Sequence, residues 1–339
     1  MPVGTERALP LDYQPKLNLR ETEIAIKQLK DFFEVRLAAA LNLTRVSAPL
    51  FVRPETGLND NLNGIERPVA FGVKDLAEAP CEVVQSLAKW KRLALRRYGF
   101  RTGEGLYTDM NAIRRDEILD NLHSLYVDQW DWEVIIPPEA RNMETLREIV
   151  RRIYGVFLAA EEYICGLYPA LSRKLPPEIF FITAQELADM YPQLSPKERE
   201  DEIAREHGAV FLAQIGGPLR EGKPHDGRAP DYDDWTLNGD IIFWYPLLAK
   251  AFEVSSMGIR VDPETLDRQL AHVCAEDRRE LPFHRDLLAG KLPQTAGGGI
   301  GQSRICMFFL DKAHIGEVQA SVWPEATLAA CEKAAVPLL

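Results

Sequence analysis

The sequence predicts an α+β fold in which helices cover a wide, mainly antiparallel sheet. Segments typical of short strands recur along the whole 339-residue chain, and longer segments with the three-and-four apolar spacing of amphipathic helices lie among them. No repeat, low-complexity tract or Pro/Gly/Ser-rich linker divides the sequence. We therefore expect an irregular arm at residues 1–19, followed by one domain at residues 20–339.

Helices and strands alternate in the first half of the chain. The pattern predicts, in order, a helix at residues 21–41, a strand at 46–52, a helix at 82–98, and strands at 106–114 and 122–134. Pro49 interrupts the first strand, which favours a sheet edge because proline lacks a backbone donor. A polar loop separates the last two strands, which predicts an antiparallel pair.

The second half begins with a long helix and continues mostly with strands. The pattern predicts a helix at residues 143–167, a strand at 179–182, a helix beginning near 184, and strands at 209–215, 241–244 and 252–259. The apolar run at residues 305–310 fits either a buried helix or a buried strand.

The bulk composition excludes several classes of partner. The net charge is −11, and a surface with this acidic excess repels phosphate backbones, so we expect no nucleic-acid partner. No apolar stretch approaches the roughly 20 residues of a membrane-spanning helix, and the start lacks the pattern of a secretory signal. We therefore expect a cytoplasmic protein with no membrane partner. The five cysteines and six histidines are scattered, which favours reduced thiols and no zinc site.

The run Gly297-Gly298-Gly299, with Arg304 shortly after it, is the strongest indication of a nucleotide site. Glycine has no Cβ, so a flat ligand can approach the backbone, and a nearby guanidinium can stack on a base or bind phosphate. The sequence contains neither a P-loop nor a dinucleotide-binding turn. A flexible loop without a ligand is the alternative.

Polar side chains recur along the predicted strand at residues 126–133. Because neighbouring residues of a strand point to opposite faces, Gln129, Asp131 and Glu133 share one face. Buried polar groups need partners, so this face favours a binding site for a small polar molecule. An edge strand with solvated acids is the alternative.

Two acidic residues are candidate metal ligands. Glu253 shares a predicted strand face with Ser255, and Arg260 follows shortly beyond them. A carboxylate beside a nucleotide usually binds Mg²⁺, which bridges phosphate oxygens. Asp240 precedes an apolar strand and is placed to assist, although a turn aspartate is more often only a cap.

The loop at residues 228–235 combines three acids, an arginine and two aromatic side chains. Arg228 can bind a carboxylate or phosphate through two parallel hydrogen bonds, and Asp233 can receive a substrate ammonium group. Loops of this kind often close over ligands, but solvated turn residues fit the pattern equally well.

These residues are shared with a known family: the chain resembles the bacterial ammonia-dependent asparagine synthetases, the aspartate-ammonia ligases, over essentially its whole length. The segments that carry the resemblance are residues 60–62, 86–92, 103–107, 126–133, 228–235, 255–260 and 293–304. This family is similar in fold to the catalytic domain of class II aminoacyl-tRNA synthetases, especially those for aspartate and asparagine. The resemblance implies that residues 20–339 form a class II synthetase-like catalytic domain.

Three class II signatures have counterparts in the sequence. The resemblance implies that the helix and strand ending at Pro49 build a homodimer interface. It implies that Arg114, with Glu117 nearby, grips the α-phosphate of ATP, and that the glycine run and Arg304 bind ATP from the opposite side. Ser303 stands where class II enzymes usually carry an acid.

The resemblance also implies a reaction, in which L-aspartate, ATP and ammonia give L-asparagine through β-aspartyl-AMP, with Mg²⁺ assisting and with AMP and pyrophosphate released. Its implied roles are Lys91 and Arg260 for substrate carboxylates, Ser86, Ser255 and Ser256 for hydrogen bonds, Asp131 and Asp233 for the ammonium group, Gln129 near the reacting phosphate, and Asp60 as acceptor of the proton from ammonium. From the residues alone, Asp60 is only a loop aspartate.

Two rival functions remain. A true aminoacyl-tRNA synthetase would need a tRNA-reading domain and a basic surface, for which the chain has neither room nor charge. A silent relative that binds adenylate as a regulator is disfavoured, because Arg114, Arg304, Glu253 and Asp60 are all present.

Overall fold

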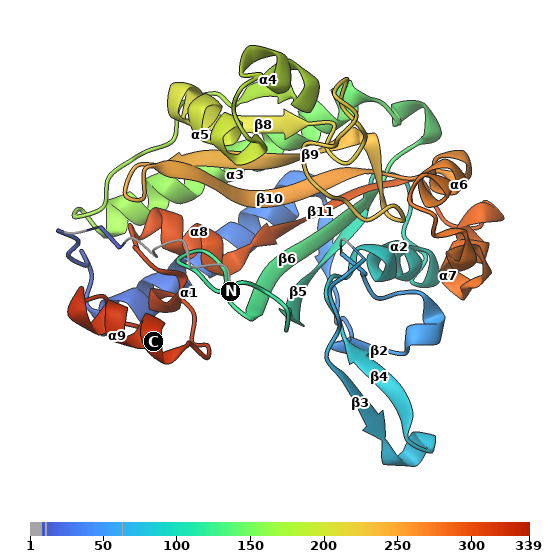
Figure 1. Ribbon diagram of the computed structural model, residues 1–339, viewed down its shortest axis with the longest axis horizontal. Coiled ribbons are helices and arrows are strands. Elements are labelled where there is room, and N and C mark those ends of the chain that lie inside the picture. The colour runs from blue at the N-terminus through green and yellow to red at the C-terminus, as the bar shows by residue number, and fades with distance from the viewer. Residues whose placement is uncertain (1–8, 11, 63) are drawn as a thin grey trace.

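The computed structural model describes residues 9, 10, 12–62 and 64–339, so residues 1–8 and 11 of the expected arm lie outside the described residues. An eight-stranded sheet with the strand order β1-β5-β6-β11-β10-β9-β8-β7 occupies its centre (Figure 1). Its strands are β1 (Leu43–Arg45), β5 (Gly105–Ile113), β6 (Tyr126–Ile135), β7 (Phe180–Thr183), β8 (Ala209–Ala213), β9 (Asp233–Tyr245), β10 (Lys250–Arg260) and β11 (Thr295–Gly301). The inner pairings are antiparallel and the two edge pairings are parallel, which confirms the predicted mainly antiparallel α+β fold.

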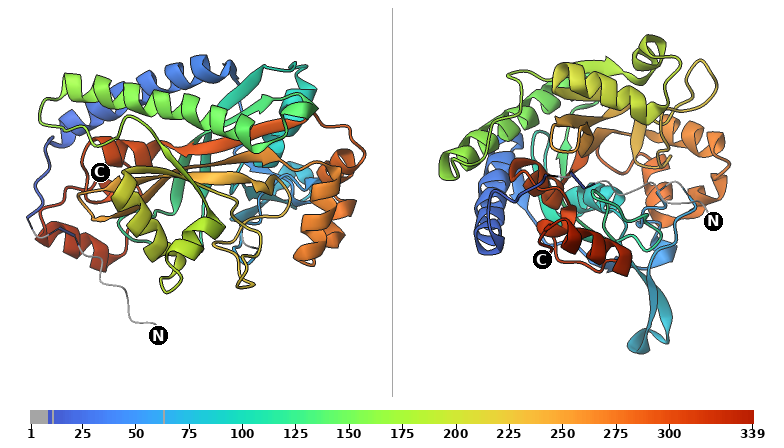
Figure 2. Two further views of the ribbon diagram at one scale, coloured as in Figure 1. Left: turned by 90° about the horizontal axis from the view of Figure 1, so that it is seen from above. Right: turned by 60° about the vertical axis from the view of Figure 1, so that its left-hand side comes forward.

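Two long helices, α1 (Leu19–Leu41) and α3 (Met143–Leu167), lie side by side across one face of the sheet (Figure 2). A capping box starts α1, because the side chains of Asn18 and Glu21 each accept the other residue's backbone N–H. Phe33 of α1 stacks on Trp130 of β6 with ring centroids 4.9 Å apart, and both side chains are buried. The main apolar core therefore lies between these helices and the sheet.

The opposite face of the sheet is covered only in part. Helices α4 (Ala184–Met190) and α5 (Pro196–His207) pack at the β7–β10 side, and α2 (Ala88–Arg97) packs over β5, β6 and β11. Helices α6 (Pro263–His272) and α7 (Pro282–Leu288) form a separate apolar cluster. The polar face of β6, β10 and β11 is therefore left open between these groups of helices.

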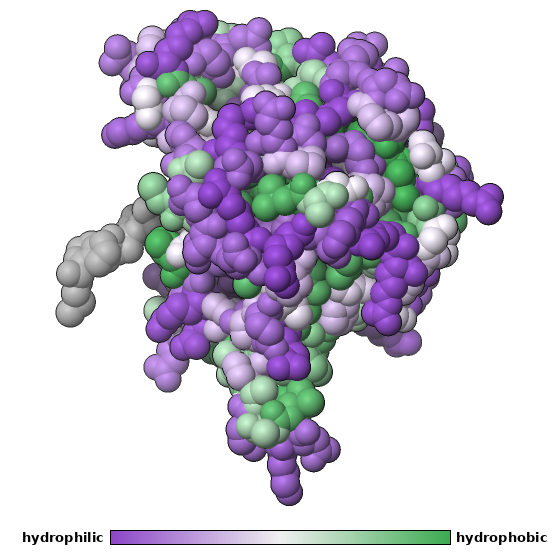
Figure 3. Space-filling view, turned by 90° about the vertical axis from the view of Figure 1, so that its right-hand side faces the viewer, coloured by the Kyte–Doolittle hydropathy of each residue, from purple (hydrophilic) through white to green (hydrophobic). Residues whose placement is uncertain are grey.

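A small second sheet projects from the body (Figure 1). It consists of β2 (Phe51–Val52), β4 (Ala79–Val83) and β3 (Ala70–Val73), with β4 in the middle. Phe51 and Phe71 pack edge to face with ring centroids 5.3 Å apart, yet they remain 47% and 39% exposed. Figure 3 shows the hydrophobic part of this projection at the bottom of the view.

Two predicted elements of the first half are wrong in extent. The strand predicted at 46–52 is interrupted, since β1 ends at Arg45, β2 begins at Phe51, and residues 46–50 around Pro49 belong to neither. The helix predicted at 82–98 begins only at Ala88, because the preceding residues pair in β4 and then link the strand to the helix.

Other elements differ at their ends or lack a predicted counterpart. Strand β6 begins at Tyr126 and not at 122, because the Asp120 carboxylate accepts backbone N–H groups in a turn there. The piece predicted at 241–244 is the middle of the longer β9, and the run at 305–310 falls largely in α8 (Gln302–Phe309). Helices α5, α6, α7 and α9 (Glu325–Lys333) have no predicted counterpart. None of the helices in the described residues is long and apolar enough to cross a membrane.

Candidate active site

A cavity of about 810 Å³ opens on the polar face of β6, β10 and β11. It brings together most of the site residues predicted from the sequence, although they come from distant parts of the chain. Those that line it are Asp60, Ser86, Lys91, Arg114, Gln129, Asp131, Arg228, Asp233, Glu253, Ser255, Ser256, Arg260, Gly298, Gly299 and Arg304. Gly297 and Asp240 do not reach its lining, because other side chains cover them.

The glycine run is a central strand of the sheet and not a loop, since β11 pairs with both β6 and β10. A Cβ on Gly299 would lie 2.5 Å from Gln129 Oε1 and 2.9 Å from Asp131 Oδ1, and a Cβ on Gly297 would meet Glu133 and Arg260. The absence of side chains therefore lets polar groups of the neighbouring strands lie across β11. The strand pairing excludes the alternative of a flexible loop, and the close approach of a ligand to these glycines stays a prediction.

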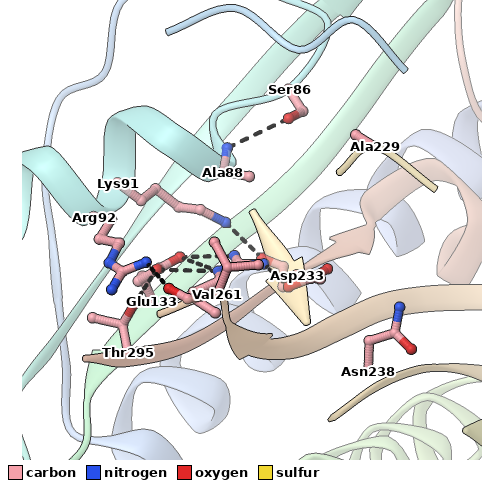
Figure 4. A network of polar contacts seen from close by, with 12 residues as sticks. Ser86, Ala88, Lys91, Arg92, Glu133, Ala229, Asp233, Asn238, Val261 and Thr295 are labelled. Atoms are coloured by element: carbon pink, nitrogen blue, oxygen red, sulfur yellow. Dashed lines mark hydrogen bonds and ion pairs between the residues drawn. The ribbon is translucent and has the colours of Figure 1, made fainter. Parts of the chain in front are cut away.

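The first charged group of the cavity, the Arg260 cluster, consists of Lys91, Asp131, Glu133, Asp233 and Arg260. Lys91 Nζ lies 3.1 Å from Asp131 Oδ2 and donates to Gly298 O at 2.8 Å. Arg260 Nη2 donates to Glu133 Oε2 at 2.7 Å, and Nη1 pairs with Asp233. Figure 4 shows Lys91, Glu133 and Asp233 converging from three different elements.

In the buried Arg260 cluster, burial and the neighbouring charges shift pKa values in opposite directions. At Asp233 burial prevails and raises the pKa despite Arg260. Burial alone would lower the pKa of Arg260, but Asp233 and Glu133 outweigh it and raise that pKa. Burial would raise the pKa of Glu133, but Arg260 and Lys91 lower it. For Lys91, burial prevails and lowers the pKa despite Asp131. Alternating signs therefore make this end of the cavity a fixed pattern of donors and acceptors.

The second charged group, the Glu253 cluster, consists of Arg228, Asp240, Glu253 and Arg304. Arg304 Nη1 donates to the backbone oxygen of Glu253 at 2.7 Å, and its guanidinium carbon lies 5.8 Å from the ring centroid of Phe252. Arg228 pairs with Asp240 and also donates to Gly227 O at 2.9 Å. These contacts with the protein hold the guanidiniums of Arg228 and Arg304 in place, and both side chains still line the cavity.

The two carboxylates of the Glu253 cluster titrate differently. Burial raises the pKa of Asp240 to about 7, and the Glu253 carboxylate adds to this rise against the opposing effect of Arg228. The pKa of Glu253 is lowered, because Arg304, Arg228 and Lys197 outweigh its burial. Asp240 Oδ1 is buried and has no hydrogen-bond partner within the described residues. A cation that met both carboxylates would replace the proton on Asp240 and satisfy this oxygen.

Arg114 and Asp60 stand on loops at the rim. Arg114 directly follows β5, its backbone N–H donates to Leu125 O at 2.8 Å, and its Nε is buried without a partner among residues that the structure describes. Asp60 is 3% exposed, and its Oδ1 accepts the backbone N–H of Leu62 at 2.8 Å. Both side chains therefore keep hydrogen-bonding capacity for a ligand.

Several polar residues around the site have no counterpart in the predicted set. Thr295 donates to Glu133 Oε1 at 2.7 Å, and Ser303 donates to Asp128 Oδ2 at 2.8 Å, which explains a serine at the start of α8. The Asp231 carboxylate binds Lys89 at 3.0 Å and His284 at 3.0 Å, joining α2 and α7 to the loop that leads into β9. Glu133 had a signal in the alternation of β6, and Asp231 had one among the acids of the loop at residues 228–235, whereas Thr295 and His284 had none.

The sequence profile of a family described as aspartate-ammonia ligase matches residues 20–335 of the chain. An aspartate-ammonia ligase from Ruminiclostridium cellulolyticum is 63% identical over 330 residues, which cover 97% of this chain and 98% of the relative. One from Clostridium perfringens is 64% identical over 331 residues, which cover 98% of each chain.

Solved structures extend the similarity to class II aminoacyl-tRNA synthetases. Asparaginyl-tRNA synthetase from Pyrococcus horikoshii, complexed with asparaginyl-adenylate, matches with a TM-score of 0.67 and 16% identity over 94% of this chain and 75% of its own. Aspartyl-tRNA synthetase from Entamoeba histolytica matches with a TM-score of 0.60 and 14% identity over 91% of this chain and 60% of its own. At these identities the similarity establishes the fold, and it confirms the class II synthetase-like architecture.

Proposed function

The chain belongs to the aspartate-ammonia ligase family, and from this premise we propose that its cavity makes L-asparagine from L-aspartate, ATP and ammonia through β-aspartyl-AMP. The observation that carries the proposal is the presence of two charged clusters in one cavity, at opposite ends of β10. The stretch of strand from Glu253 to Arg260 spans about 20 Å, which accommodates an amino acid beside a nucleotide.

The Arg260 cluster is the proposed aspartate site. Substrate aspartate brings two carboxylates and one ammonium group, and each needs a group of opposite charge. Lys91 and Arg260 suit the carboxylates, and Asp131 and Asp233 suit the ammonium. Hydroxyls from Ser86, Ser255 and Ser256 add neutral hydrogen bonds on the same lining.

In the first proposed step, an oxygen of the aspartate β-carboxylate attacks the α-phosphorus of ATP. A C–O–P bond forms, the bond to the bridging oxygen breaks, and pyrophosphate leaves with that electron pair. Two anions meet, so fixed positive charge must be in place beforehand. Arg114 at the rim and Arg304 beside Phe252 are the proposed donors, with Gly298 and Gly299 of β11 beneath the nucleotide.

Mg²⁺ is part of the proposal, with Glu253 and Asp240 as its protein ligands. Asp240 lies behind the cavity lining, where Arg228 covers it, but its Oδ1 is buried without a partner among the described residues and its pKa is raised to about 7 beside a second carboxylate, which favours a divalent cation between Asp240 and Glu253. When bound, Mg²⁺ would neutralise phosphate charge and orient the phosphate oxygens. Within the described residues no group of three or more His, Cys, Asp or Glu is arranged to hold a metal ion, so phosphate oxygens and water would complete the coordination.

In the second proposed step, the nitrogen lone pair of ammonia attacks the β-carbonyl carbon of the adenylate. A C–N bond forms, the C–O bond to phosphate breaks, AMP leaves with that electron pair, and the attacking nitrogen gives one proton to the departing phosphate to become the amide. Ammonium is the main form at neutral pH and must first lose a proton, which Asp60 is placed to accept. Gln129 lies on the lining next to Gly299, where it can contact the reacting phosphate.

One assay tests this route. Purified enzyme is incubated with ATP, aspartate and Mg²⁺, with either ammonium or glutamine, while asparagine and nucleotides are measured. We expect asparagine and AMP in equal amounts with ammonium. ADP as the product, or activity with glutamine alone, would refute the route. Aminoacylation of added tRNA would favour a tRNA synthetase instead.

The proposal includes a homodimer that works in the cytoplasm as a single catalytic domain at residues 20–339. The exposed apolar side chains of the small sheet, including Phe51 and Phe71, suit burial against a second copy. Sedimentation at micromolar concentration is expected to give twice the mass of 38.3 kDa. A monomer at that concentration would remove the dimer from the proposal.

A further inference from the structure

Gln85, in the link between β4 and α2, lines the cavity directly beside Asp60. Its side chain is buried, and its Nε2 donates to the backbone oxygen of Asp60 at 2.9 Å. Because a backbone carbonyl can only accept, this contact fixes which end of the amide is nitrogen. Oε1 points to the other side and is buried without a hydrogen-bond partner in the described part of the chain.

Asn59 holds Gln85 and Asp60 together as one unit. Its Oδ1 accepts the backbone N–H of Asp60 at 3.0 Å and that of Gln85 at 2.9 Å. Its Nδ2 donates to Glu82 Oε2 at 3.0 Å and to Val83 O at 3.3 Å, which anchors the unit to the end of β4. The loop with Asp60 and the segment with Gln85 are therefore fixed relative to each other before any ligand binds.

A buried acceptor without a donor is unfavourable, and a ligand that brings an N–H group would satisfy it. The Asp60 carboxylate beside it favours a cation, and ammonium is a cation that carries four N–H donors and no acceptor. ATP is rich in acceptors, and the ammonium group of aspartate already has Asp131 and Asp233 of the Arg260 cluster as its proposed partners. The nitrogen donor is therefore the ligand that matches both groups.

We propose that Gln85 Oε1 and the Asp60 carboxylate together bind the nitrogen donor, with Gln85 as a neutral acceptor and Asp60 as the proton acceptor. This inference rests on the proposed function. Asp60 takes one proton from ammonium, and Gln85 holds a second N–H without competing for that proton. The lone pair of the resulting ammonia is then free to attack the adenylate, and AMP departs as described above.

The test uses Gln85→Met, which keeps the length of the side chain and removes both polar atoms. Aspartate-dependent exchange of pyrophosphate into ATP reports the first step and needs no nitrogen donor. Asparagine formation at varied ammonium reports the second. We expect the KM for ammonium to rise about ten- to hundredfold, as for a lost hydrogen bond to a charged donor, with a much smaller change in exchange.

Two further variants separate binding from structure. Gln85→Glu restores an oxygen acceptor, so its KM for ammonium is expected to lie between those of the wild type and Gln85→Met. Gln185→Met, on α4 and outside the cavity, is the matched control and should leave both measurements unchanged.

An unchanged KM for ammonium in Gln85→Met would overturn the inference, as would equal losses of exchange and ammonium affinity that Gln85→Glu does not rescue. Failure of the proposed function has a different signature. Unmodified enzyme that makes asparagine without aspartate-dependent exchange would refute the adenylate route, and this inference with it.

Discussion

The Arg260 cluster and the Glu253 cluster lie along the same strand but differ in how completely their charges are paired. In the Arg260 cluster each charged side chain has an ionic partner within the protein, through Lys91–Asp131, Arg260–Glu133 and Arg260–Asp233. Around the Glu253 cluster, Asp240 Oδ1 and Arg114 Nε are buried without partners among the described residues. At the Arg260 end of the cavity every charged side chain is paired without a ligand. At the Glu253 end, buried polar atoms remain available for hydrogen bonds or ionic contacts with a ligand.

This difference follows from the ligands that each end must bind. A small zwitterion is distinguished by a fixed pattern of opposite charges, so a pattern held by internal ion pairs gives selectivity before binding. A triphosphate and a divalent cation bring large charges of their own, so groups that remain unsatisfied can be completed by them. The contrast predicts that substitutions in the Arg260 cluster act mainly on the stability of the fold, and that substitutions around the Glu253 cluster act mainly on catalytic activity.

The largest expected effect is on stability, in Glu133→Gln. Gln has nearly the shape of Glu but no charge, so Arg260 would keep one ion pair instead of two inside the protein. Removing one partner of a buried pair costs about 3–5 kcal/mol in the free energy of unfolding. Urea denaturation measures this loss. Glu144→Gln is the matched control, because Glu144 pairs with Arg151 on the surface, where the loss should stay under about 1 kcal/mol.

Equal losses of unfolding free energy in Glu133→Gln and Glu144→Gln would show that the ion pairs of the Arg260 cluster stabilise the protein no more than a surface ion pair does. The contrast between the two ends of the cavity would then disappear.

Arg114→Ala should have the next largest effect, on activity. Loss of one donor aimed at developing charge slows catalysis about 10²- to 10³-fold. The measurement is aspartate-dependent exchange of pyrophosphate into ATP. Unfolding free energy should change by less than about 1 kcal/mol, because the side chain lies at the rim of the cavity. The exposed neighbour Arg115, changed to Ala, is the control and should retain exchange. A large loss of stability in Arg114→Ala would contradict the division between the two ends.

Alternation along a strand was the part of this site that the sequence could predict. Gln129, Asp131 and Glu133 share the polar face of β6 while Trp130 is in the core, because the two-residue period of a strand is local. The long helices α1 and α3 were predictable for a similar reason, since their apolar periodicity extends over six turns or more.

Contacts between distant loops were not predictable. Asn59 meets Gln85 across 26 positions, and Lys89 meets Asp231 across 142. No local pattern in the sequence distinguishes such residues from solvated polar side chains, because only the fold brings their partners close. The short and highly charged helix α5 was missed for a related reason, since its buried stripe is narrow.

Gly299→Ala tests the glycine strand that joins the two clusters, and its expected effect is smaller. The new Cβ would press on Gln129 and Asp131, so the unfolding free energy should fall by about 1–3 kcal/mol, as for other overpacked sites. The KM for aspartate should rise as Asp131 shifts. Gly155→Ala in α3 is the control, because its Cβ meets nothing within 4 Å, and it should stabilise the helix by about 0.5–1 kcal/mol. Wild-type stability in Gly299→Ala would mean that a ligand, and not neighbouring side chains, requires this glycine.

Measured over a single pH unit, the smallest expected effect concerns titration, and it tests whether the Glu253 cluster is incomplete without a ligand. An unfolded chain releases the proton of Asp240 near about pH 4, whereas the folded protein holds it to about pH 7. Between these values the folded state binds more protons, so its free energy of unfolding falls as pH rises, by at most about 1.4 kcal/mol per pH unit. Asp240→Asn removes this titration and should flatten the decline of unfolding free energy with pH, measured by denaturation without Mg²⁺.

At pH 8, Mg²⁺ should raise the melting temperature of the wild type more than that of Asp240→Asn, because the cation takes the place of the missing proton. Identical pH slopes in the two proteins would mean that the two carboxylates do not constrain each other, and the Glu253 cluster would then be as complete as the Arg260 cluster.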